Sequence, residues 1–137
     1  MVSITRRFEF CYSHLLCGHE GKCKNLHGHN AVLEVEVAQY LPGLLNAYQN
    51  QQKESHQVPL KDAMVMDFGD LGKAVKETIL DPLDHHHLND IFPFHPTAEN
   101  LCIWVAKTIQ AAIGQIVVRI RIWETSNCYA EWKKGDV

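Results

Sequence analysis

The segment that decides the fold is Val2-Ser-Ile-Thr-Arg-Arg-Phe-Glu-Phe-Cys-Tyr-Ser-His14, in which apolar and polar residues largely alternate. Such alternation predicts a strand with one buried face, because successive side chains of a strand point to opposite sides. Residues 29–38 alternate in the same way, and the polar residues 15–26 between the two segments contain two glycines. The chain is therefore expected to begin with a β-hairpin.

Two helices and two further strands are expected to follow. Apolar residues recur at helical spacing over 69–81. A second helix is expected to begin after Thr97, whose hydroxyl is a suitable N-cap, and to end near Gly114. Residues 116–124 alternate again, and a last strand is expected over 128–133. The order β-β-α-α-β-β predicts an α+β fold, with an antiparallel four-stranded sheet carrying two helices on one face.

Length and composition favour a globular enzyme or binding protein. The 137 residues are 46% hydrophobic, which suits one domain over 1–137 with a substantial core. Residues 40–62 are rich in Gln and Asn and predict an exposed insertion between the second strand and the first helix. The net charge of −3, with both signs interspersed, indicates neither a nucleic-acid nor a membrane surface.

Cellular context follows from the N-terminus and the cysteines. The first ten residues carry charge where a signal peptide would be apolar. The five cysteines show no spacing typical of a disulfide framework. We therefore expect a cytoplasmic protein with free thiols.

Three histidines predict a metal site. His27 and His29 are two residues apart at the start of the second strand, so their side chains share a face. His14 ends the first strand, which the hairpin places beside them. Three imidazoles with an open fourth position are typical of catalytic zinc. The alternatives are histidines without a metal, or a closed structural zinc bound by Cys17 and Cys23 together with His27 and His29.

Three further positions carry candidate chemistry. Cys23 lies four residues before His27 between two lysines, which favour a reactive thiolate, although a buried structural thiol is the common alternative. Cys11, Cys102 and Cys128 have the character of structural residues. Asp84 beside His85 suggests a carboxylate that orients a general base. The alternatives there are an exposed histidine run or a second metal-binding tract formed by residues 85–87.

Glu124 continues the apolar face of the strand over 116–124. A carboxylate on such a face is costly unless it is paired or used. A planar guanidine-like group, as in a pterin or guanine ring, would donate two hydrogen bonds to it. The alternative is an ion pair at the strand end, for instance with an arginine.

These motifs occur together, and in the same order, in one known family. They are Phe10-Cys-Tyr-Ser-His14, Lys22-Cys23-Lys-Asn-Leu-His27-Gly28-His29, Met66-Asp67-Phe68, Leu83-Asp84-His85-His-His-Leu88-Asn89, Pro96-Thr97-Ala98-Glu99-Asn100 and Glu124-Thr125. From about residue 4 to 133, the chain resembles the 6-pyruvoyltetrahydropterin synthase / 6-carboxytetrahydropterin synthase family. The combination of Cys-x₃-His-Gly-His with Asp-His-x-x-Leu-Asn is specific to it.

The resemblance implies the tunnelling (T) fold, in which sheets of neighbouring subunits join into trimers and trimers pair as hexamers. It implies active sites at subunit interfaces and 7,8-dihydroneopterin triphosphate as substrate. His14, His27 and His29 match the zinc ligands, and Cys23 matches the catalytic cysteine. Asp84 and His85 match the proton-relay pair of a neighbouring subunit. Glu124 matches the anchor of the pterin ring, expected at the end away from the metal, and Thr97 lies in a segment that helps to hold the ring.

The spacing within the family favours one branch. The short Cys-x₃-His-Gly-His motif resembles the bacterial 6-carboxytetrahydropterin synthases of queuosine and deazapurine synthesis, which release acetaldehyde and triphosphate. The pyruvoyl-forming enzymes, which release triphosphate only, usually have a longer gap, and folate-type relatives carry Glu in place of Cys23. A non-catalytic pterin- or metal-binding protein of this fold is the alternative of another class. Departures from the pattern include Leu15, where an arginine is common, and the long 40–62 connection.

Overall fold

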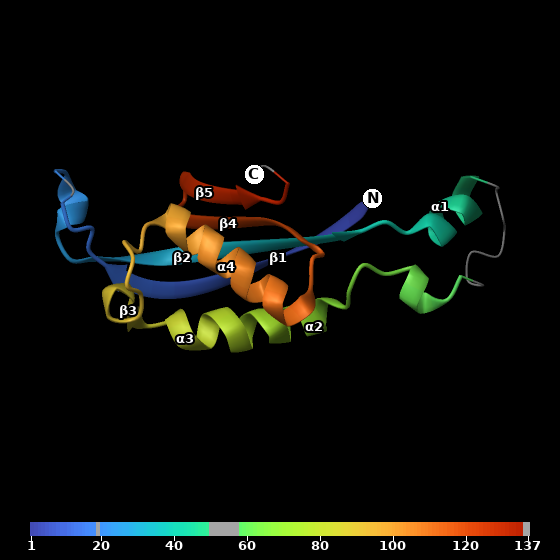
Figure 1. Cartoon of the computed structure of the whole chain (residues 1–137), viewed down its shortest axis with the longest axis horizontal. Helices are drawn as coiled ribbons and strands as arrows, with labels where there is room; N and C mark the ends of the chain where they lie inside the picture. Colours follow the sequence, from blue (N-terminus) through green and yellow to red (C-terminus); the bar gives the residue numbers. More distant parts are fainter. Residues whose placement is uncertain (19, 50–57, 136–137) are drawn as a thin grey trace.

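A computed structural model describes residues 1–18, 20–49 and 58–135 of the chain. Its centre is a five-stranded sheet with the order β3-β1-β2-β4-β5 (Figure 1). The strands are β1 (Val2–His14), β2 (His27–Gln39), β3 (His86–His87), β4 (Val117–Thr125) and β5 (Cys128–Lys133). The α+β class is confirmed, and the predicted first and last strands have the observed bounds.

The sheet differs from the prediction by one short strand. β3 pairs in parallel with β1, Tyr12 opposite His86, so the sheet is neither four-stranded nor wholly antiparallel. Two residues are too few to show alternation in a sequence. The strand forms because the His85 N–H donates to the Cys11 carbonyl at 2.7 Å and the Cys11 N–H donates to Asp84 Oδ1 at 2.8 Å.

Two helical segments pack on one face of the sheet, as predicted (Figure 1). They are α2 (Phe68–Val75), which a π-helical turn, η4 (Lys76–Leu80), joins to α3 (Asp81–Leu83), and α4 (Ala98–Ile113), whereas α1 (Pro42–Gln49) lies beyond the end of the sheet. Short 3₁₀ turns occupy η1 (Lys22–Lys24), η3 (Leu60–Asp62) and η5 (Leu88–Asp90). Cross-strand neighbours Phe8, Leu33 and Ile122 lie in register under the helices and form the middle of the core.

The π-helical turn keeps the buried side chains of the continuous helix formed by α2, η4 and α3 facing the sheet. Leu71, Val75, Ile79 and Leu83 are fully buried and are spaced four residues apart. Four residues advance a regular α-helix by about 400°, so an apolar row with that spacing would drift about 40° at each step. The wider i→i+5 turn over Lys76–Leu80 absorbs this drift. The helix consequently ends with Leu83 still in the core and Asp84 at the edge of β1.

The segment predicted as an insertion extends beyond the end of the sheet in Figure 1, where α1 and η3 lie. Residues 50–57 of that segment lie outside the described residues. Within the described ranges, none of the helices has the length and apolar character needed to cross a membrane.

The other face of the sheet carries ion pairs instead of helices. Arg119 Nε donates to Glu36 Oε2 at 2.5 Å, and Arg121 Nε donates to Glu131 Oε1 at 2.6 Å. Glu34 is 9% exposed between the two guanidinium groups. Burial raises the pKa of Glu36 and of Glu131, but the hydrogen bonds and charges of Arg119 and Arg121 outweigh it, so both pKa values lie below the usual 4.5.

Acid should therefore destabilise the protein partly through these pairs. A carboxylate with a lowered folded-state pKa stabilises the fold above its unfolded pKa, and that stabilisation is lost as pH falls through the folded value. We expect Glu36→Gln to cost on the order of 1 kcal/mol at pH 7, and less as pH falls below about 4.5. Chemical denaturation from pH 7 to 3 measures this. Glu9→Gln, at an exposed position of β1, is the control, and equal pH profiles for both variants would contradict the assignment.

Candidate active site

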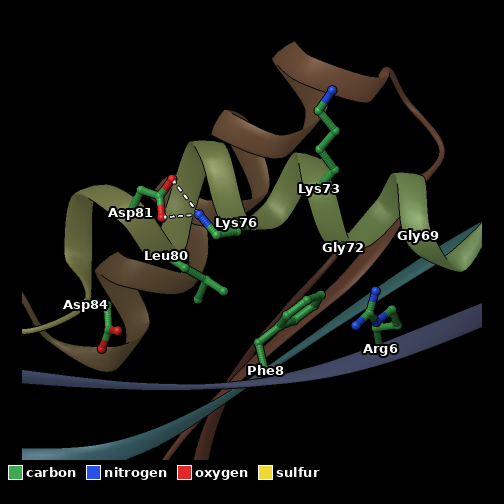
Figure 2. Close-up of a pocket in the computed structure, with 9 residues that line it drawn as sticks. All are labelled: Arg6, Phe8, Gly69, Gly72, Lys73, Lys76, Leu80, Asp81 and Asp84. Atoms are coloured by element: carbon green, nitrogen blue, oxygen red, sulfur yellow. Dashed lines mark hydrogen bonds and ion pairs between the residues drawn. The ribbon is translucent and has the colours of Figure 1, made fainter.

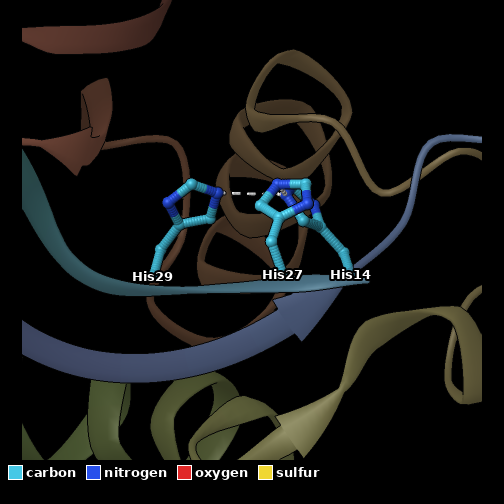
Figure 3. A group of neighbouring side chains, drawn as sticks. All are labelled: His14, His27 and His29. Atoms are coloured by element: carbon cyan, nitrogen blue, oxygen red, sulfur yellow. Dashed lines mark hydrogen bonds between the residues drawn. The ribbon is translucent and has the colours of Figure 1, made fainter. Parts of the chain in front are cut away.

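The three predicted metal ligands converge at the end of the hairpin where residues 15–26 connect β1 to β2 (Figure 3). His14 lies opposite His27 in the β1–β2 register, and His29 lies opposite Tyr12, so all three histidines share the core face. The Nε2 atom of His14 is 2.9 Å from Nε2 of His27 and 3.2 Å from Nε2 of His29. The hairpin register thus brings three imidazoles to one point, as strand parity predicts.

The hydrogen bonds of these rings suit a metal. His14 Nδ1 is 2.7 Å from the Pro96 carbonyl and His27 Nδ1 is 2.8 Å from the Asn25 carbonyl. A carbonyl accepts, so each Nδ1 carries the proton and each Nε2 presents a lone pair. Two lone pairs at 2.9 Å repel unless a cation or a proton lies between them. Tetrahedral zinc with Zn–N bonds of 2.0–2.1 Å separates its nitrogens by about 3.3 Å, close to the observed distances.

Burial reinforces this preference at His14. The side chain is 1% exposed, and burial lowers its pKa below 6.5, although the Pro96 hydrogen bond and Glu124 oppose the shift. A neutral imidazole is the form that binds metal. The residues present therefore fit a cation with borderline-soft character, such as zinc.

The closed site with two cysteines is not formed by the described residues. The histidine cluster contains neither Cys17, which is exposed, nor Cys23. Cys23 lies in η1, and its carbonyl accepts from the Leu16 N–H at 2.9 Å. This bond closes the loop that connects His14 to His27, and the half-exposed Cys23 lies within that loop. Cys102 is buried, and burial raises its pKa to about 12, which makes it the least reactive thiol.

Glu124 lies against the histidine cluster. Its Oε1 accepts from the Tyr12 hydroxyl at 2.9 Å, and its Oε2 is 3.1 Å from His29 Nε2. Among the described residues Glu124 has no arginine partner, and it lies beside the three histidines and not at an end away from them, because cross-strand register places Tyr12, His29 and Glu124 on one face. Burial and Glu124 together hold the pKa of Tyr12 above its usual 10, so it remains a phenol donor.

Glu124 also lines a small cavity. The cavity, of about 180 Å³, lies between the first turn of α4 and the β4–β5 hairpin and is lined by Ala98, Glu99, Ile122, Glu124, Cys128, Tyr129 and Ala130. Cys128 is exposed there, so the structural role expected for it is wrong. The lining thus includes Ala98 and Glu99 from the segment 97–100 that the sequence singled out, together with the carboxylate of Glu124.

Thr97 is the N-cap of α4, as predicted, and its hydroxyl accepts from the Asn100 N–H at 3.1 Å. Asn100 in turn donates to the His95 carbonyl at 2.8 Å. These bonds fix the turn whose Pro96 carbonyl holds His14. The segment is therefore built into the metal site as well as into the cavity wall.

Asp84 and His85 form a separate pair. His85 Nδ1 is 3.0 Å from Asp84 Oδ1, and the His85 side chain is 78% exposed. The hydrogen bond from the Cys11 N–H is the main cause that lowers the pKa of Asp84, and the hydrogen bond and charge of His85 lower it further. The pair clusters with Cys11 at the outer edge of β1 and not with the three histidines of the same chain. His86 and His87 bond to the Asp84 carbonyl and to Ser13 instead of forming a metal tract with His85.

Two supporting residues escaped sequence reasoning. The sequence gives no site role to Tyr12, although it stands two residues before His14 on the same face. Asn89 accepts from the Leu15 N–H at 2.9 Å and donates to the Leu15 carbonyl at 3.0 Å. This two-way bond ties the segment after His85 to the residue that follows His14. The sequence signal for Asn89 is its place at the end of the Asp-His-x-x-Leu-Asn motif, which does not reveal its bonds to Leu15.

A cavity of about 620 Å³ lies between α2–α3 and β1, with Asp84 at one end (Figure 2). Its cations already have partners. Arg6 donates to the Phe68 carbonyl, Lys73 faces Glu77 at 4.0 Å, and Lys76 is bound by Asp81 at 3.0 Å. Because these three cations are already paired, this cavity is a weaker candidate for a catalytic site than the histidine cluster.

Comparison with known proteins places the whole chain among pterin enzymes. A family model described as 6-pyruvoyl tetrahydropterin synthase matches residues 3–135. A protein of Haemophilus influenzae named 6-carboxy-5,6,7,8-tetrahydropterin synthase is 32% identical, with 98% of this chain and 100% of the relative covered. A 6-pyruvoyl tetrahydrobiopterin synthase of Dictyostelium discoideum is 29% identical, with 96% of each chain covered.

A solved structure agrees in fold. The 6-pyruvoyl tetrahydropterin synthase of Caenorhabditis elegans superposes with a TM-score of 0.74 at 23% identity, covering 96% of this chain and 94% of that one. The predicted T-fold architecture is confirmed by this likeness.

Proposed function

The chain belongs to the 6-pyruvoyl tetrahydropterin synthase family of lyases, and from this we propose that it is a zinc-dependent 6-carboxytetrahydropterin synthase. It would convert 7,8-dihydroneopterin triphosphate to 6-carboxy-5,6,7,8-tetrahydropterin, with loss of acetaldehyde and triphosphate. The observation that carries the proposal is the convergence of the Nε2 atoms of His14, His27 and His29. The short Cys-x₃-His-Gly-His spacing favours this branch.

Each residue has a role that its surroundings support. Zinc bound by the three histidines would supply Lewis-acid polarisation of the substrate side-chain hydroxyls. Cys23, in the loop between the ligands, would move a proton as thiolate, and His85 would move one as imidazole. Asp84 accepts from the His85 ring and would hold its orientation. Glu124 and the Thr97 turn would hold the pterin ring in the cavity beside the metal.

The exposed position of the Asp84–His85 pair supports a site shared between subunits. The pair lies at the outer edge of β1, apart from the histidine cluster of its own chain. β5 leaves the opposite edge of the sheet unpaired within the described chain. We therefore propose that subunits join edge to edge in trimers and hexamers, so that this pair faces the metal of a neighbour.

The activity is tested by incubating zinc-loaded protein with 7,8-dihydroneopterin triphosphate. We expect acetaldehyde, triphosphate and the 6-carboxypterin in equal amounts. Triphosphate without acetaldehyde would show the pyruvoyl-forming reaction, for which the Dictyostelium relative is named. Pterin binding without any turnover would show a binding protein and contradict the enzyme proposal.

Glu124→Gln should weaken substrate binding. The amide accepts from Tyr12 as the carboxylate does, but loses the charge that would pair with a guanidine-like ring edge. A hydrogen bond to a charged group contributes about 1.5–3 kcal/mol, so kcat/KM should fall by roughly 10- to 100-fold, mostly through KM. Steady-state kinetics measure this, with Glu77→Gln, far from the cavity, as control. Loss of metal at unchanged KM would instead make Glu124 a metal-site residue.

A further inference from the structure

A second group of metal-binding side chains lies outside the histidine cluster. One donor atom each of Cys11, Asp84 and His85 lies within 4.8 Å of the other two. A thiol, a carboxylate and an imidazole together are the donor types of zinc sites. In the single chain the three are partly or fully accessible, and in the proposed assembly they would face the shared active site, which substrate must enter from solvent, so an ion can reach them without unfolding the edge of the sheet.

The backbone holds these donors in place. The Cys11 N–H fixes Asp84 Oδ1 at 2.8 Å, and the Cys11 carbonyl accepts from the His85 N–H at 2.7 Å. His85 has φ of +60°, a left-handed conformation that is uncommon for residues other than glycine, although asparagine, aspartate and histidine adopt it more often than the rest. Strain of this kind persists only where the surrounding structure imposes it and is concentrated at functional sites. Here it turns the histidine back so that its ring meets Asp84.

The sulfur has a neighbour that can support a ligand. Cys11 Sγ donates to Asn30 Oδ1 at 3.1 Å. A side-chain amide has donors as well as an acceptor, so Asn30 can donate to the sulfur once the thiol proton has left. Such outer hydrogen bonds orient and tune metal ligands.

We propose that Cys11, Asp84 and His85 form a second site for a thiophilic divalent cation, and that an ion bound there inhibits the enzyme. Inhibition rests on the proposed function, because the ion would replace the proton between Asp84 and His85. No electron transfer is involved: Cys11 releases one proton to solvent and its thiolate binds the ion, while the Nδ1 proton of His85 moves to Nε2 by exchange with solvent, so that the neutral ring offers Nδ1 to the ion. The site would be weaker than the three-histidine site, since its ligands are more exposed.

Binding is tested without reference to activity. Protein carrying one zinc per chain is titrated with Co²⁺, and absorbance reports thiolate-to-cobalt charge transfer. We expect one further Co²⁺ per chain with this band. Cys11→Ser should lose the band and weaken Co²⁺ binding at least about tenfold, whereas Cys17→Ser and Cys128→Ser, also at accessible thiols, should keep both. A band that persists in Cys11→Ser, or no band at all, would overturn the site.

Inhibition is tested on the same variants with excess Zn²⁺. Wild type and Cys17→Ser should lose turnover as the second equivalent binds. Cys11→Ser should retain its basal rate and resist inhibition, because serine leaves the backbone bonds of residue 11 unchanged. Binding with undiminished turnover would overturn the inhibitory role. If the chain turns over no pterin at all, the proposed function fails while the cobalt titration still decides the site.

Discussion

Replacing His14 with alanine should leave the protein folded but without its metal, and should lower kcat/KM at least about 10³-fold. The two remaining histidine nitrogens would bind zinc far more weakly than three, and without zinc the hydroxyl groups of the substrate side chain are no longer polarised. Elemental analysis after reloading with zinc gives the metal content, and product release gives the rate. His27→Ala should behave in the same way at a less buried position, so a folding defect at His14 alone would not mimic the result.

The exposed His95 offers the matched control, since His95→Ala should keep both metal and activity. One pattern of results would contradict the three-histidine site. If His14→Ala keeps its zinc while Cys23→Ala and Cys17→Ala lose it, the metal is held by the cysteine pair with His27 and His29.

Cys23→Ala should keep the zinc and lose roughly 10²- to 10⁴-fold in kcat, the usual contribution of a positioned acid or base. The thiol lies in the loop between ligands but outside their cluster, so its removal should spare the metal. Rapid-quench assays and elemental analysis of the same sample separate the two effects. Cys17→Ala, in the same loop, should be active at the wild-type rate, and a Cys23→Ala variant with normal turnover would remove the thiol from the mechanism.

The regular elements were predictable because they are local. Alternation gives β1 its observed bounds, and the Thr97 cap and Gly114, with φ of +93°, fix the ends of α4. Strand parity together with the pairing of the hairpin brings His14 to His27. In these cases the periodicity of the backbone decides the structure, and one sequence displays that periodicity.

What the sequence could not show depends on partners distant in the chain. β3 exists because Asp84 and His85 bond to the backbone of Cys11, and 73 residues separate Asp84 from Cys11. Glu124 carries no mark of its contact with Tyr12 and His29, and both ring-binding and ion pairing fitted its position. The π-helical turn is visible only afterwards, as an apolar spacing of four where 3.6 is usual.

That turn marks the place where this helix can change its length without disturbing the chemistry beyond it. Removing one of residues 76–78 would leave the apolar row spaced four, three and four residues apart, which is one face of an ordinary α-helix. Leu83 would then stay in the core, and Asp84 would keep its place beside the Cys11 N–H. A codon-sized deletion at this point is therefore expected to preserve the Asp84–His85 pair, so related chains can differ in length here and share the same pair.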